Sequence, residues 1–258
     1  MPIELSVAAL FYNEEEAAES VVRNVHAVMT REGLAFEIVA VDNGSRDRTP
    51  EILKRLSGEF PELRIVTVAV NQGAGYGAIQ GLYAGIGDVI VGIPGDGQVD
   101  PEAIPPLLRA MRLESADIAH GLRRNRPDGW QRWLVSKAYN LLMAVLFGVP
   151  AGDMNGPPKL LRRDALNALK LCSADHFLDC EMMLKARRMG MRVATMPVEF
   201  LPRAGGTSTI RFKDCLTYLH HLIVIRVRRE DPWGINAIPK QTATSYLATR
   251  STRAQVGG

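Results

Sequence analysis

Residues 36–50 read FEIVAVDNGSRDRTP and contain a strand, a loop and the start of a helix. The apolar run at 36–41 predicts a buried strand, because strands covered on both faces are almost continuously hydrophobic. The polar residues 42–45 then favour a loop. Thr49 and Pro50 predict a helix start, with the Thr49 hydroxyl as its cap and proline at its first position. This stretch therefore predicts one strand-loop-helix unit of an α/β fold.

Similar units lie on either side of this stretch. Residues 5–10 form an apolar run, a polar segment follows, and apolar residues then recur at helical spacing over 18–29, so a strand and a helix capped by Asn13 are expected. Further strands are predicted at 63–68, 89–93, 117–120 and 192–200, and further helices at 78–84, 101–113, 130–147 and 178–189. This alternation predicts an α/β fold with a mixed, mostly parallel sheet and helices on both faces.

Composition narrows the class of protein. The chain has 258 residues, of which 47% are hydrophobic, and its formal net charge is +3. Eight basic and three acidic residues fall within 211–258, so the basic excess is a C-terminal feature. We would expect a nucleic-acid binder to spread a basic stripe over its body, so no nucleic-acid partner is expected.

Other features bear on location. The three cysteines form no C-x-x-C pair, which argues against a disulfide framework or structural zinc. The longest uncharged apolar stretches, at 138–152 and 215–225, are shorter than the ~20 residues of a membrane-spanning helix. Residues 1–10 contain an acidic residue and no basic one, unlike a signal peptide. We therefore expect a cytoplasmic protein, with peripheral contact at the cytoplasmic face of the membrane as a further option.

The chain is expected to divide into three parts. Residues 1–212 should form the α/β domain. Residues 213–230 have apolar residues on one side and polar residues on the other, which predicts an amphipathic helix. Its apolar side could pack against the domain or lie in the membrane interface with its arginines near lipid headgroups. Residues 231–258 lack periodicity and are expected to form a mobile tail.

Four polar loops follow the predicted strands, at 11–14 (FYNE), 42–47 (DNGSRD), 71–77 (NQGAGYG) and 94–98 (PGDGQ). Because parallel strands end at one edge of a sheet, these loops should converge on one crevice. Carboxylates there can bind a base, a ribose or a divalent cation, and glycines let the backbone approach a phosphate. Each motif alone could be a simple turn, but their order and spacing favour a nucleotide diphosphate site.

The order F/Y-N-E, V-D-N/D-G-S-x-D-x-T, N-x-G-x-G and D-G-Q-x-D-P-E resembles the family-2 glycosyltransferases of GT-A fold. Within that family the chain is most similar to the dolichyl- or polyprenyl-phosphate mannose synthase-like branch, over about residues 3–212. One departure stands out, since Pro94 replaces the first aspartate of the usual D-x-D-x-Q pattern. This replacement removes one anionic contact to the cation or the ribose.

The resemblance implies a role for each matching residue. Asp42 is expected near the base, and Asp96 with Gln98 at a divalent cation, Mg²⁺ or Mn²⁺, that neutralises the leaving group. The substrate-binding residues that the resemblance implies are Phe11, Tyr12, Asn13, Glu14, Asp42, Asn71, Gln72, Gly73, Asp96, Lys159, Arg203 and Ser208.

The implied reaction is inverting transfer of a mannose- or glucose-type sugar from a GDP- or UDP-sugar to a polyprenyl phosphate. Arg123 and Arg132 would position that acceptor, which is already an anion and needs no base. If the acceptor is instead a hydroxyl of a soluble molecule or saccharide, Asp179 would act as general base. A catalytically impaired binder of sugar nucleotides is a third possibility, which Pro94 supports.

Overall fold

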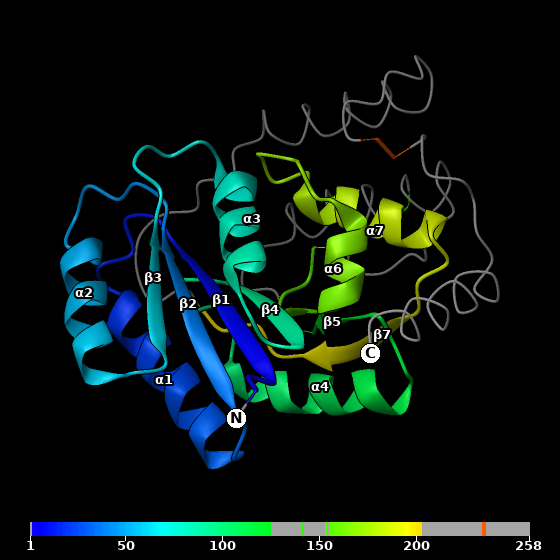
Figure 1. Ribbon diagram of the computed structural model, residues 1–258, viewed down its shortest axis with the longest axis horizontal. Helices are drawn as coiled ribbons and strands as arrows, with labels where there is room; N and C mark the ends of the chain where they lie inside the picture. The colour runs from blue at the N-terminus through cyan, green and yellow to red at the C-terminus, as the bar shows by residue number, and fades with distance from the viewer. Residues whose placement is uncertain (1, 125–140, 142–152, 154, 203–233, 236–258) are drawn as a thin grey trace.

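The computed structural model describes residues 2–124, 141, 153, 155–202, 234 and 235 (Figure 1). The helices expected at 130–147 and 213–230 and the tail expected at 231–258 lie outside these residues, apart from Leu141, Gly234 and Ile235. The predicted site residues that lie outside the described residues are Arg132, Arg203 and Ser208.

The described part of the chain folds around a seven-stranded sheet with the order β3-β2-β1-β4-β6-β5-β7. Neighbouring strands are parallel except at β6, which is antiparallel to both β4 and β5. The mixed, mostly parallel sheet is thus confirmed. Its strands are β1 (Leu5–Phe11), β2 (Phe36–Asp42), β3 (Leu63–Thr67), β4 (Val89–Pro94), β5 (Ile118–Arg123), β6 (Lys159–Arg162) and β7 (Val193–Val198).

Helices cover both faces of this sheet (Figure 1). Along β1, Leu5, Val7 and Ala9 pack into one core layer and Ala8 into the other, because successive side chains of a strand point to opposite faces. The first layer contains α1 (Ala18–Arg31), α2 (Thr49–Glu59) and α4 (Ile104–Leu113), the last preceded by the short 3-10 helix η1 (Pro101–Ala103). The second layer contains α3 (Ala74–Ala84), α6 (Arg163–Leu169) and α7 (Leu178–Arg188).

Two expected helix caps are wrong. The residue before α1 is Ala17 and not Asn13, and no side chain caps this helix. Thr49 is the first residue of α2, and its hydroxyl accepts a hydrogen bond from the Glu14 N–H instead of capping its own helix. Both polar side chains serve to join loops, as described below.

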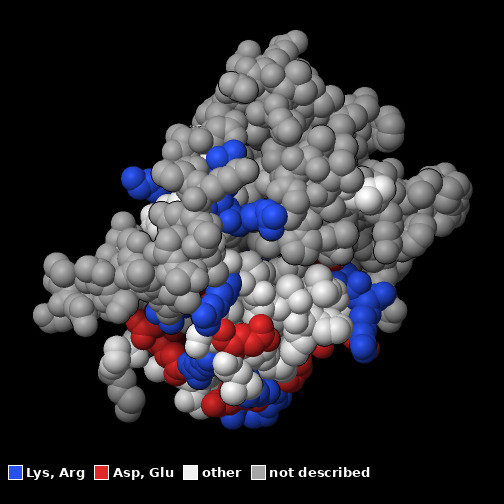
Figure 2. Space-filling model, turned by 90° about the vertical axis from the view of Figure 1, so that its right-hand side faces the viewer, with Lys and Arg blue, Asp and Glu red and all other residues white. Residues whose placement is uncertain are grey.

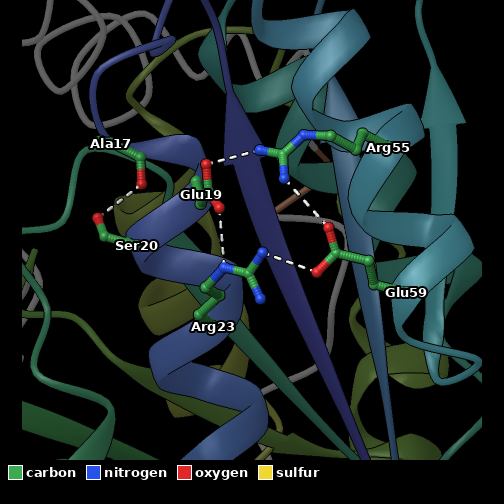
Figure 3. Close-up of polar contacts among 6 residues, drawn as sticks. All are labelled: Ala17, Glu19, Ser20, Arg23, Arg55 and Glu59. Atoms are coloured by element: carbon green, nitrogen blue, oxygen red, sulfur yellow. Dashed lines mark hydrogen bonds and ion pairs between the residues drawn. The ribbon is translucent and has the colours of Figure 1, made fainter.

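Four charged side chains join α1 to α2 in a closed ring of ion pairs (Figure 3). Arg23 contacts Glu19 (2.9 Å) and Glu59 (2.7 Å), and Arg55 contacts the same two carboxylates at 2.6 and 3.1 Å. Hydrogen bonds from Arg55 and then Arg23 lower the pKa of Glu19. The four side chains are exposed, so water and salt screen these pairs and the ring adds little to stability.

The surface carries both signs of charge. Figure 2 shows acidic and basic side chains interspersed over the described lower part of the side that it presents. Among the ion pairs of the described surface are Arg31–Glu102 (2.6 Å) and Arg109–Glu32 (3.1 Å). No helix in the described ranges is both long enough and apolar enough to cross a bilayer.

Candidate active site

The polar loops meet because the strands that precede them end together. Phe11 of β1 pairs with Asp42 of β2, Asp42 pairs with Thr67 of β3, and Leu10 of β1 pairs with Pro94 of β4. These pairs place four loops at the carboxyl edge of the sheet, where open α/β sheets bind ligands.

Hydrogen bonds join the loops after β1 and β2 into one unit. Asn13 donates its N–H to Ser45 Oγ (3.0 Å), and its Oδ1 accepts the Arg46 N–H (2.8 Å). The Glu14 N–H donates to Thr49 Oγ1 (2.9 Å). Asn13 has a φ of 54°, a left-handed conformation that asparagine adopts more readily than most residues. The predicted residues Asn13 and Glu14 therefore shape this loop pair through their backbone and side chain.

Two aspartates fix the loop after β2. Asp42 is buried, and its Oδ1 accepts the Ser45 N–H (3.0 Å). Asp47 accepts the N–H groups of Thr49 (3.0 Å) and Glu15 (3.0 Å). Burial alone would raise the pKa of Asp47, but hydrogen bonds from Thr49 and Glu15 outweigh burial and lower that pKa. The loop therefore carries a fixed negative charge at neutral pH.

A cavity of about 350 Å³ opens beside this loop. Its volume is in the range of small-ligand sites. Two of its walls, Tyr12 and Asn71, are predicted site residues, whereas the sequence did not single out Val70 as a ligand contact. The lining residues are Tyr12, Gly44, Ser45, Arg46, Ala69, Val70 and Asn71.

The glycine-rich segment before α3 has an unexpected neighbour, the α6–α7 loop (residues 170–177). A Cβ on Gly75 would collide with the carbonyl oxygens of Ser173 and Asp175, and a Cβ on Gly73 with that of Ala174. The Tyr76 N–H donates to the same Ala174 oxygen (3.0 Å). These two glycines thus allow close approach of another chain segment, a role that the sequence did not indicate.

The loop after β4 presents Asp96 and Gln98. Asp96 is buried, its Oδ1 accepts the Gln98 N–H (3.0 Å), and Gly97 between them has a φ of 75°. Among the described residues, no three His, Cys, Asp or Glu side chains gather as a metal-binding set. One carboxylate and one amide oxygen suit a cation that keeps waters and shares substrate phosphates, as Mg²⁺ usually does. The residues present therefore fit a substrate-bridged cation and not a closed protein cage.

Charged side chains also gather around β5 and β6, which lie beyond β4 in the sheet. Lys159 Nζ lies 2.9 Å from Asp179 Oδ1, with the lysine buried and the Asp179 side chain 35% exposed. Arg123 makes a two-pronged ion pair with Asp153, at 2.5 Å from Nε and 2.7 Å from Nη2. Burial, reinforced by the charge of Lys159, lowers the pKa of His120 to about 4, so this imidazole is neutral at pH 7.

The structure separates the predicted residues into groups. Tyr12, Asn13, Asp42 and Asn71 come together around the cavity, and Lys159 pairs with Asp179. The ring of Phe11 is fully buried in the core, so the expectation that this side chain binds substrate is wrong.

Sequence reasoning missed two polar residues of the region. Asn43 is buried and donates from Nδ2 to the Gly73 carbonyl (3.2 Å). Glu181 is also buried, and it follows Asp179 by two residues on α7. The spacing of Glu181 and Lys185, four residues apart on a helix, was the available signal for a paired carboxylate.

The sequence profile of the family described as glycosyl transferase family 2 matches residues 6–170. The chain belongs to this family. Two curated relatives are both named undecaprenyl-phosphate 4-deoxy-4-formamido-L-arabinose transferase. The protein from Pectobacterium atrosepticum is 28% identical over 221 residues, and the one from Enterobacter sp. (strain 638) is 30% identical over 223 residues. Each alignment covers 85% of this chain but 66% of the relative, so the chain spans about two thirds of their length.

Solved structures with the same fold as this chain support the expected GT-A fold. Glucosyl-3-phosphoglycerate synthase from Mycobacterium tuberculosis, in complex with Mn²⁺, UDP and glucosyl-3-phosphoglycerate, superposes with a TM-score of 0.69 at 19% identity. The match covers 89% of this chain and 82% of that one. A further structure of the same synthase contains Mg²⁺ and UDP and has a TM-score of 0.68. The GT-A fold expected from the sequence is thereby confirmed.

Proposed function

We propose that this chain is an inverting glycosyltransferase that moves a sugar from a nucleotide diphosphate sugar to a polyprenyl phosphate. The observation that carries the proposal is a cavity lined by the loops after β1, β2 and β3, with the loop after β4 at the same edge of the sheet. Family membership supports the reaction class, and the names of the curated relatives support the acceptor class.

The donor binds at the edge formed by β1, β2 and β3. Tyr12 and Asn71 line the cavity that receives the nucleoside, and Asp42 lies beside it with one oxygen held by the Ser45 N–H. These contacts are made before and during transfer alike, so they set donor affinity more than turnover. GDP- and UDP-sugars of mannose or glucose type are both candidate donors.

Asp96 and Gln98 hold a divalent cation, Mg²⁺ or Mn²⁺, at the end of β4. Such an ion, when bound, neutralises the charge that develops on the diphosphate leaving group. The hydrogen bond that Asp96 Oδ1 accepts from the Gln98 N–H holds this side chain in position. Because Pro94 stands where the usual D-x-D-x-Q pattern has its first aspartate, Asp96 would be the carboxylate of that pattern that holds the cation.

The acceptor oxygen approaches from the side of β5 and β6, opposite the leaving diphosphate, and attacks the anomeric carbon with inversion. Lys159 already contacts one oxygen of Asp179, so a proton accepted there would meet a neighbouring ammonium. This geometry favours an acceptor that has no proton to lose, namely a phosphate. Arg123, Arg132 and Arg203 are the proposed cations for that phosphate, with peripheral contact at the membrane surface.

The decisive experiment is a transfer assay with radiolabelled UDP- and GDP-sugars. Vesicles that contain polyprenyl phosphate are compared with a soluble saccharide acceptor, each with Mn²⁺, Mg²⁺ or a chelator. We expect labelled lipid that forms only with a cation. Transfer to the soluble acceptor alone, or nucleotide binding with no transfer, would contradict the proposal and favour the hydroxyl-acceptor enzyme or the impaired binder, respectively.

A further inference from the structure

A fully buried carboxylate lies beneath the α6–α7 loop. Glu181 Oε1 accepts the Cys172 N–H (3.0 Å), and Oε2 accepts the Ser173 N–H (2.8 Å). Lys185 Nζ donates to Glu181 Oε1 (2.6 Å) and to the Lys170 carbonyl (2.8 Å). The Glu181–Lys185 pair therefore holds α7 against the loop that precedes it, through hydrogen bonds with the backbone of Lys170, Cys172 and Ser173.

The outer side of the same loop completes the start of α3. The Tyr76 N–H lies in the first turn of that helix, where an amide has no acceptor within the helix. The Ala174 carbonyl supplies that acceptor at 3.0 Å. At the far end of α3, the Tyr83 hydroxyl accepts the Leu171 N–H (3.0 Å) and donates to the Leu166 carbonyl (3.1 Å). The loop is thus attached to both ends of α3.

The two helices that this loop contacts, α3 and α7, both begin at the candidate site. The residues just before α3 include Asn71, which lines the cavity, and Gly73, whose carbonyl accepts a hydrogen bond from Asn43. The first turn of α7 carries Asp179, which contacts Lys159. A change in how the loop sits against α3 would move the donor side relative to Asp179.

We propose that Glu181, together with Lys185, is a positioning residue that sets the donor loop and Asp179 in a fixed relation by holding the α6–α7 loop against α3. A buried ion pair is weak evidence for stability by itself, because the loss of water around both charges offsets their attraction. The Glu181 carboxylate also accepts hydrogen bonds from two loop N–H groups, those of Cys172 and Ser173. An apolar residue in place of Glu181 would leave these two donors without that acceptor. The effect on catalysis rests on the proposed function, whereas the docking of the loop does not.

Glu181→Gln tests the proposal. Glutamine keeps the size of the side chain, but its NH₂ group replaces one of the two oxygens that accept hydrogen bonds from the loop N–H groups and Lys185. We expect the Tyr76 amide to exchange with solvent at least about tenfold faster, while Gly77, whose N–H bonds to the Gly73 carbonyl inside the helix, serves as internal reference. UDP or GDP should bind more weakly by calorimetry. In the transfer assay kcat should fall about 100-fold, because a displaced Asp179 no longer holds Lys159 on the acceptor side, and a displacement of about 1 Å has that effect on positioned groups.

Glu37→Gln is the matched control. Glu37 is also buried and accepts the Ser6 hydroxyl and the Ile86 N–H (both 2.6 Å), but it lies near the start of β2, at the other end of that strand from Asp42. The Glu37→Gln variant should be less stable than the wild-type chain, with the same exchange rate of the Tyr76 amide, the same nucleotide affinity and the same kcat. If Glu181→Gln does not fold, Glu181→Gln/Lys185→Met removes both charges and leaves none unpaired, and the same Tyr76 result is expected.

Equal behaviour of the Glu181 and Glu37 variants, with a lower unfolding temperature but unchanged Tyr76 exchange and nucleotide affinity, would overturn the positioning role. Failure of the wild-type chain to use polyprenyl phosphate would instead overturn the proposed function. The exchange and binding measurements need no acceptor, so the two failures are distinguishable.

Discussion

At the scale of single residues, Asp96 carries two tasks that a pair of substitutions can separate. Its carboxylate holds the Gln98 N–H and is the anionic ligand proposed for the cation. Asp96→Asn keeps an acceptor for that N–H but removes the charge, whereas Asp96→Ala removes both. We expect each to reduce transfer by at least about 10²-fold, because charge on the leaving diphosphate is no longer neutralised.

Circular dichroism and the unfolding temperature check that the fold survives, and the asparagine variant should resemble the wild-type chain in both. An asparagine variant with near-normal turnover would refute the assignment of Asp96 to the cation.

Asp179 distinguishes the two kinds of acceptor. With a phosphate acceptor, Asp179→Asn should retain substantial activity, because no proton has to be removed. With a hydroxyl acceptor the same variant should lose roughly 10²–10⁴-fold in rate, the usual contribution of a general base. The rates are measured with both acceptors at saturating donor.

Lys159→Met is the companion variant for Asp179, since the two side chains lie 2.9 Å apart. It should weaken use of the lipid phosphate more than Asp179→Asn does, because it removes a buried cation from the acceptor side. An Asp179→Asn enzyme that is inactive on the lipid phosphate, beside an active Lys159→Met enzyme, would count against a phosphate acceptor.

The sequence predicts which residues lie at the ends of neighbouring strands, but not which side chains they contact. The order of the motifs placed Tyr12, Asp42 and Asn71 at neighbouring strand ends, and the parallel register brings them together. Arg123 is expected at the acceptor phosphate from its place in the order of motifs, but nothing in the local sequence indicates that its guanidinium also pairs with Asp153, thirty residues away. Such long-range pairs depend on the tertiary fold and leave no trace in local spacing.

At the scale of secondary-structure elements, the contact between α3 and the α6–α7 loop makes a steric prediction. Gly75→Ala would drive a Cβ into the carbonyl groups of Ser173 and Asp175. We expect a loss of about 1–3 kcal/mol in unfolding free energy, as for other overpacked sites, together with faster Tyr76 exchange.

Gly58→Ala in α2 is the control for this substitution, because a Cβ there meets nothing within 4 Å. It should stabilise the protein by up to about 1 kcal/mol, since alanine is the better helix former. Denaturant unfolding of both variants gives the comparison. Equal effects of the two substitutions would mean that the loop does not press on α3.

Elements with a long apolar period were predictable, and short ones were not. The expected strands match β1 to β4 to within about one residue at each end, because the sequence of each is rich in apolar residues. The four residues of β6, KLLR, and the seven of α6 were missed. A strand this short has no period of its own, and it pairs antiparallel between β4 and β5 only because the rest of the sheet offers both edges.

At the scale of the whole molecule, the sheet consists of two unequal parts. The four parallel strands β3, β2, β1 and β4 carry the loops of the donor side, and β6 then reverses direction and joins them to β5 and β7. The polar cluster of His120, Lys159 and Asp153 lies around β5 and β6, and Gln98 on the β4 side contacts Leu201 beyond β7. Residues of the candidate site therefore lie on both parts of the sheet.

His120 links this cluster to the stability of the whole fold. Burial, with a further contribution from the Lys159 charge, lowers its pKa from 6.5 to about 4 in the folded protein. Between these two values the unfolded chain binds a proton that the folded chain does not, so stability falls as the pH falls from about 6.5 to 4. The loss attributable to this group approaches about 3 kcal/mol at the lower end, at about 1.4 kcal/mol for each unit of pKa.

His120→Gln cannot take up this proton, so its unfolding free energy should decline less over that interval. Above about pH 7.5 the difference between variant and wild type should be constant, which provides the reference. Urea unfolding at a series of pH values measures both curves, and parallel curves from pH 8 to 4 would show that His120 is not buried in its neutral form.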